Sequence, residues 1–79
     1  MKRDIYVISY NDIIIKKNAW NSSIRTIESI VRDIARTENT IYRLVNSESI
    51  KNEYREHVSG FRVWQADNGK TIKFTVEKV

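Results

Sequence analysis

The N-terminal pattern of apolar and polar positions predicts a β-hairpin. The segment DIYVISYNDIIIKKNAW is rich in β-branched and aromatic residues, which favour strands. Asn11 and Asp12 interrupt two apolar runs, as the loop of a tight hairpin does. With these two residues as the loop, Tyr10 faces Ile13. We therefore expect a β-hairpin over residues 4–20.

The C-terminal pattern predicts a second hairpin with a stronger turn signal. The segment FRVWQADNGKTIKFTVEKV contains Asn68-Gly69, and both of these residue types can take positive φ in a two-residue loop. That loop pairs Val63 with Phe74 and gathers apolar side chains on one face of the hairpin. Sliding the register by one residue would exchange the two faces. We therefore expect a β-hairpin over residues 60–79.

Trp64 lies on the other face of this expected hairpin, together with Arg62 and Lys73. A tryptophan flanked by cations can stack on a base of single-stranded nucleic acid. The alternative is that Trp64 packs under the helices or under the first hairpin, and we favour this packing role.

Between the hairpins, apolar residues follow a helical period. One set, spaced i, i+3, i+4 and i+7, predicts a first amphipathic helix, and a second set, spaced i, i+3 and i+4, predicts a second short helix. The sets are Ile27, Ile30, Val31 and Ile34, then Ile41, Leu44 and Val45. Thr26 or Ser23 can cap the first helix and Thr37 the second. We expect a helix-turn-helix over residues 23–46, followed by a segment up to Gly60 that is mostly loop with room for one helical turn.

These elements predict one small α+β domain over residues 1–79, in which an N-terminal β-hairpin, a central helix-turn-helix and a C-terminal β-hairpin pack together. The length of 79 residues suits one domain. Apolar residues make up 41% of the chain and proline is absent, which argues against extended disorder.

Composition narrows the class of function. The chain has no cysteine and one histidine, His57, so we expect no metal site, no cofactor and no enzymatic activity. His57 reads as a solvated loop residue. No cleavage-site pattern follows the short apolar run at the N-terminus, and no stretch approaches the roughly 20 apolar residues of a membrane helix. We expect a cytoplasmic protein with no membrane partner.

The charge balance is compatible with nucleic acid. Lysine and arginine number 14 against 10 acidic residues, a net charge of +4, which is mildly basic for a small chain. In a helix-turn-helix, the outer side of the second helix reads the major groove of DNA. Asn and Arg can form paired hydrogen bonds with adenine and guanine, and Thr can donate to phosphate. The candidate DNA-binding residues are Asn39, Thr40, Tyr42, Arg43, Asn46, Thr37, Arg36 and Arg25. Glu38 counts against this interpretation because a carboxylate repels phosphate.

The same stretch resembles a known family. TIESIVRDIARTENTIYRLVN, residues 26–46, is similar at ungapped spacing to the pattern SIxEAAxxLGISxxTIYxxLN of the nuclease-associated modular domains, or intron-encoded nuclease repeats. These are small DNA-binding modules attached to phage and intron homing endonucleases. The flanking segments YVISYNDIIIKKNAW and SGFRVWQ extend the resemblance over roughly residues 6–65. Ala35 and Arg36 depart from the family pattern, so Arg36 must reach solvent. The resemblance implies that Asn39, Thr40, Tyr42, Arg43 and Asn46 face DNA.

Two functions from different classes remain open. The first is a stand-alone module that binds double-stranded DNA, as a small transcription regulator encoded by a phage or another mobile element. A single module buries limited DNA surface, so we expect it to need a homodimer or a partner protein. The second is a small phage-type viral protein that binds and inhibits a host protein in the bacterial cytoplasm, through strand edges and an exposed Tyr42 or Trp64.

Overall fold

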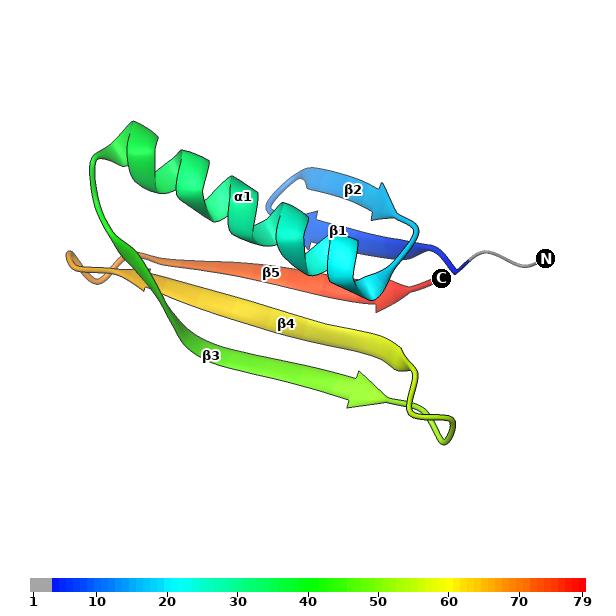
Figure 1. Cartoon of the computed structure of the whole chain (residues 1–79). Helices are drawn as coiled ribbons and strands as arrows, with labels where there is room; N and C mark the ends of the chain where they lie inside the picture. The colour runs from blue at the N-terminus through cyan, green and yellow to red at the C-terminus, as the bar shows by residue number, and fades with distance from the viewer. Residues whose placement is uncertain (1–3) are drawn as a thin grey trace.

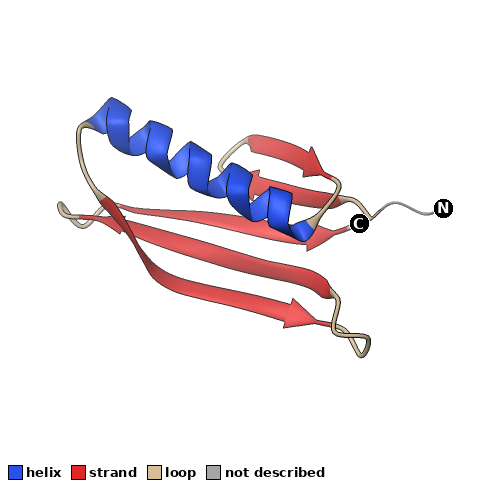
Figure 2. Ribbon diagram, in the orientation of Figure 1, coloured by secondary structure: helices blue, strands red, loops and turns tan. Residues whose placement is uncertain are grey.

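A computed structural model describes residues 4–79 as one five-stranded antiparallel sheet with a single helix across one face (Figures 1 and 2). In chain order the elements are β1 (Tyr6–Tyr10), β2 (Ile13–Lys17), α1 (Trp20–Glu38), β3 (Tyr42–Lys51), β4 (His57–Ala66) and β5 (Thr71–Lys78). The strands lie side by side in the order β2-β1-β5-β4-β3. Helix α1 therefore connects the two edge strands. The opposite face of the sheet is covered by no other element of the described chain.

The expected helix-turn-helix over residues 23–46 is wrong, because the chain forms one helix and then a strand. Asn39 ends α1 in the left-handed conformation, with φ of +52°. The Thr40 amide donates to the Ala35 carbonyl and the Asn39 amide to the Arg36 carbonyl, which is the Schellman arrangement that terminates helices. The next residues are β-branched and aromatic, and they continue as β3 rather than as a second helix.

Helix α1 buries the apolar face that the first helical pattern predicts. Ile27 and Val31 are buried in the core, and Ile30 and Ile34 pack against it. The helix starts earlier than expected, at Trp20. Its N-cap Ala19 makes no side-chain hydrogen bond. The proposed caps Ser23 and Thr26 lie inside the helix, where their hydroxyls donate back to carbonyls four residues earlier.

The N-terminal hairpin has the expected register. Tyr10 pairs with Ile13 and Ile8 with Ile15 across the loop at Asn11 and Asp12. Strand β1 also pairs with β5, so the hairpin joins the C-terminal strands in one sheet.

The C-terminal hairpin forms between β4 and β5, but its register is one residue away from the expected one. Gly69 takes positive φ, and its amide donates to the Ala66 carbonyl, while the Ala66 amide donates to the Lys70 carbonyl. This loop is longer than the two-residue loop that we expected and has a glycine bulge. The shift pairs Trp64 with Ile72 and exchanges the faces of β4.

The shifted register places the core between α1 and the sheet. Its buried apolar residues are Tyr6, Ile8, Ile27, Val31, Trp64, Ile72, Phe74 and Val76. Trp64 is 8% exposed and meets the Phe74 ring edge-to-face at 5.8 Å. The packing role favoured for Trp64 is thereby confirmed. The stretch from residue 47 to 60, expected to be mostly loop, instead contains the second half of β3, a turn at residues 52–56 and the start of β4.

Candidate interaction surface

Strand β3 forms one edge of the sheet and contains the longest run of exposed residues in the described chain. It has ten residues, of which all but Tyr42 are exposed. It pairs with β4 on one side and with no other strand among residues 4–79. An edge strand presents unpaired N–H and C=O groups that another strand can pair with. Figure 1 shows β3 at the border of the sheet, to one side of α1.

A small polar cluster holds the start of β3 against the end of α1. The Tyr42 hydroxyl donates to Glu38 Oε1 at 2.6 Å, and the Lys70 ammonium donates to Glu38 Oε2 at 2.6 Å. The Lys70 hydrogen bond, followed by that of Tyr42, lowers the pKa of Glu38. The bond to the carboxylate raises the pKa of both Tyr42 and Lys70. The cluster thus joins α1, β3 and the β4–β5 turn.

The far end of β3 is held by the turn at residues 52–56 and by aromatic stacking. The Asn52 side-chain oxygen accepts hydrogen bonds from the amides of Tyr54 and Glu56. His57 then stacks on Trp20 with ring centres 4.3 Å apart. The interpretation of His57 as a solvated loop residue is therefore wrong, since it is half-buried at the start of β4.

Burial lowers the pKa of His57, and the charges of Lys51 and Arg62 lower it further. Its Nδ1 atom is buried and has no hydrogen-bond partner among the described residues. The neutral ring therefore acts as an aromatic packing group beside β3.

A bulge divides β3 into two halves. Leu44 pairs with Trp64 and Asn46 with Val63, so that Val45 is an extra residue. Because paired residues share a face and Trp64 faces the core, Leu44 lies on the helix-facing side. The pairs assign the outer face to Arg43, Asn46, Glu48 and Ile50, and the helix-facing side to Tyr42, Leu44, Ser47 and Ser49.

Apolar side chains gather along this edge. Ile41, Leu44, Val45 and Ile50 are 61%, 51%, 53% and 48% exposed. Scattered exposed apolar residues are ordinary, but a group of them along one open strand suits an interface. The sequence pattern missed this surface because the first three residues were assigned to lock two helices together. The run TIYRLV, which is rich in β-branched and aromatic residues, is the signal that could have revealed the strand.

The predicted DNA-binding residues are distributed over different surfaces. Arg25, Arg36 and Thr37 are exposed on α1, and Asn39 and Thr40 follow its end. The hydroxyl of Tyr42 is bound to Glu38, whereas Arg43 and Asn46 lie on the outer face of β3. The structure brings together only Arg36, Asn39 and Thr40, which line a shallow hollow with Ala35 and Ile41. Arg36 reaches solvent, as expected.

The cations do not form a shared basic face. Arg25 and Arg36 lie on the helix layer, while Arg43 lies on the opposite face of the sheet. Lys51 lies at the far end of β3. The structure is elongated, with principal extents of 44 × 20 × 19 Å. These four side chains therefore do not form one continuous surface that a DNA duplex could contact.

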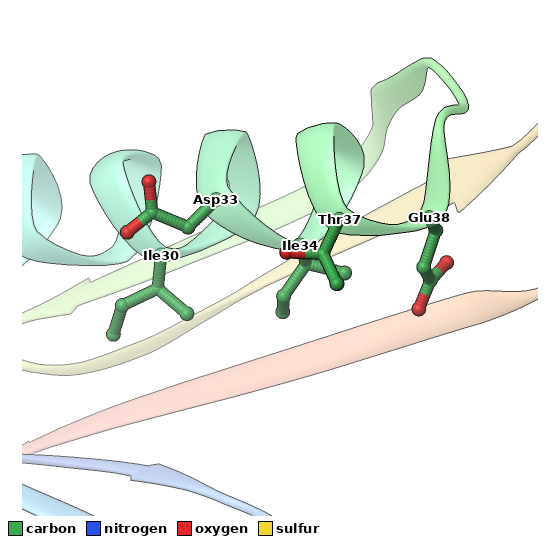
Figure 3. Close-up of a pocket in the computed structure, with 5 residues that line it drawn as sticks. All are labelled: Ile30, Asp33, Ile34, Thr37 and Glu38. Atoms are coloured by element: carbon green, nitrogen blue, oxygen red, sulfur yellow. The ribbon is translucent and has the colours of Figure 1, made fainter.

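Hollows on the surface offer little chemistry. The one shown in Figure 3 has a volume of about 240 Å³ and is lined by Ile30, Asp33, Ile34, Thr37 and Glu38 of α1. Its Glu38 is already bound to Lys70 and Tyr42. Across the described residues, no cluster of three or more His, Cys, Asp or Glu side chains could hold a metal ion. None of these residues forms a helix long and apolar enough to cross a bilayer.

The fold and the exposed strand together define a one-helix, five-stranded domain with one long open edge. Comparisons with protein-family models, curated proteins and solved structures find no match to this chain. The resemblance to nuclease-associated modular domains stays a prediction, although the helix-turn-helix that carried it is not formed.

Proposed function

We propose that this chain is a protein-binding module that pairs the edge of β3 with an extended strand of another polypeptide. The observation that carries the proposal is the ten-residue exposed strand with one free side. In strand addition, main-chain hydrogen bonds supply much of the affinity and alternate side chains supply specificity. The exposed apolar residues of β3 provide the side-chain contacts.

Of the two functions expected from the sequence, protein binding is better supported by the geometry. DNA binding required a second helix that reads the major groove, and residues 42–51 form a strand instead. The arginines that were expected to accompany this helix lie on separate faces. Binding to double-stranded DNA stays a prediction, but a strand stands where the DNA-reading helix was expected.

A displayed library of random peptides as long as β3 tests the proposal. We expect binders to be selected by the wild-type protein and to slow amide hydrogen exchange along β3. Val45→Lys should weaken their binding, because a lysine on an open edge disfavours pairing. The matched control is Ile14→Lys on the other edge strand, where Ile14 is 67% exposed, and it should leave binding unchanged.

Failure to select any binder, or binders that protect α1 and leave β3 amides unchanged, would refute the proposal. Double-stranded DNA added at low salt provides a second probe. Slowed exchange over Arg43 and Asn46 with DNA, in the absence of any peptide binder, would favour the DNA hypothesis instead.

A further inference from the structure

We propose that the strand which pairs with β3 is the β3 strand of a second copy of this chain. This inference rests on the proposed function and names its partner. Two antiparallel copies of β3, related by a two-fold axis, would join the two sheets into one continuous sheet. The same strand is then used by both copies, as in other interfaces with two-fold symmetry.

The bulge at Val45 selects the register in which a second copy can pair with β3. Strand β4 pairs with β3 across this bulge, and the faces stay matched on both sides of the extra residue. A second copy brings the same extra residue. When the two bulges lie together at the two-fold axis, both halves of the strands stay in phase. The axis then passes between Val45 and Asn46.

Charge supports this register. Arg43 and Glu48 are five positions apart, a spacing that places residues on opposite faces of a regular strand. The bulge places both on the outer face. In the proposed register, Arg43 of each copy lies opposite Glu48 of the other, which gives two pairs of opposite charges. Neither residue forms an ion pair within residues 4–79.

The other side chains of the two β3 strands also lie on matching faces in this register. On the helix-facing side, Leu44 lies opposite Ser47 of the second copy and Tyr42 lies opposite Ser49. Ile41, directly before the strand, meets Ile50 at each end of the pairing. Each of the four exposed apolar residues thereby gains a neighbour from the second copy. Ile41 and Ile50 lie opposite each other, Leu44 lies opposite Ser47 and Val45 lies opposite Asn46. Opposite charges and apolar pairs across strands stabilise a sheet.

Sedimentation equilibrium over a range of protein concentrations tests the pairing. The wild type should form a dimer. Arg43→Glu should weaken the dimer about tenfold, because it places two carboxylates opposite each other at both symmetric positions. Glu48→Arg should do the same with two cations. The double variant Arg43→Glu/Glu48→Arg restores opposite charges in each pair and should recover the wild-type association.

Circular dichroism of each variant verifies that the monomer still folds, and Lys73→Glu on the same outer face, but on the interior strand β5, controls for net charge. A protein that stays monomeric overturns the inference, as does a dimer that Arg43→Glu does not weaken or a double variant that does not recover. If the monomer still selects peptides that protect β3, the proposed function stands and only the second copy is wrong. If it selects none, both proposals fail.

Discussion

The two edges of the sheet differ in how well they are protected against pairing with another strand. Strand β2 has five residues and ends in Lys16 and Lys17, shortly before α1 begins at Trp20. Strand β3 is twice as long and has no lysine until its last residue, Lys51. Short length and lysine are two ways in which natural sheets protect their edges. Only β2 uses both of them.

Apolar exposure alone does not separate the two edges. Ile13 and Ile14 on β2 are exposed as well, so exposed isoleucine is common to both. The difference lies in the number of backbone groups that a partner could pair with and in the charges that a partner must approach. The comparison therefore shows that β3 differs from β2 in length and in edge lysines, and not in apolar exposure.

Gly60→Ala should have the largest effect, and it should act on the β3 side of the sheet. A Cβ at this position would lie 2.4 Å from the Glu48 carbonyl oxygen of β3 and 2.8 Å from Trp20. Because the first contact is with backbone, β3 must move away from β4. We expect the free energy of unfolding to fall by about 2 to 3 kcal/mol, measured by chemical denaturation.

Hydrogen exchange would show which edge this substitution affects. Amides in β3 should exchange faster in Gly60→Ala, while the β1–β2 hairpin stays protected. Ser59→Ala, one residue earlier on the outer face of β4, is the control and should change stability by less than about 0.5 kcal/mol. An equal loss of protection in β2 would contradict the distinction between the edges.

Asn39→Ala should have an intermediate effect on stability, because Asn39 ends α1 before the chain continues into β3. Asn39 has φ of +52°, where a Cβ is unfavourable and asparagine is better tolerated than alanine. We expect a loss of about 1 kcal/mol in thermal or chemical unfolding. Asn39→Gly should be neutral or slightly stabilising, and destabilisation by glycine equal to that by alanine would argue against this role.

The smallest effect should come from protonation of His57 at the far end of β3. Its pKa is lowered from the ordinary 6.5 by burial and by nearby cations, so the unfolded chain binds the proton more readily. Stability should therefore be greatest above about pH 6.5 and fall as the pH drops toward the lowered pKa. Unfolding measured between about pH 7.5 and 5.5 should show this decrease.

His57→Phe keeps an aromatic ring on Trp20 and removes the titration. Since His57 is the only histidine, this variant should show a flatter profile over the same pH range. A profile identical to that of the wild type would mean that His57 is not the group responsible.

Local patterns predicted part of this fold. The first hairpin had a two-residue loop and the expected register, and the helical period at Ile27 and Val31 correctly predicted a buried helix face. The second hairpin was misplaced by one residue, because Asn68-Gly69 fits both a two-residue loop and a longer loop with a bulge at Gly69. Only the packing of Trp64 in the core decides between these registers.

The candidate surface was missed because its sequence pattern is ambiguous. Ile41, Leu44 and Val45 fit a helical period, yet the same residues lie on and beside an exposed strand. Asn39 ends α1, although it was expected to lie on the outer side of a second helix. The bulge at Val45, which places Arg43 and Glu48 on one face, depends on pairing with β4 and has no local signal.

Amide hydrogen exchange of the wild-type protein at low and high concentration tests the central claim most directly. That claim is that β3 pairs with a strand from a second copy, and that β2 does not. We expect β3 amides to exchange more slowly as concentration rises, with β2 amides unchanged. Exchange in β3 that is independent of concentration, or slowing confined to β2, would contradict the account.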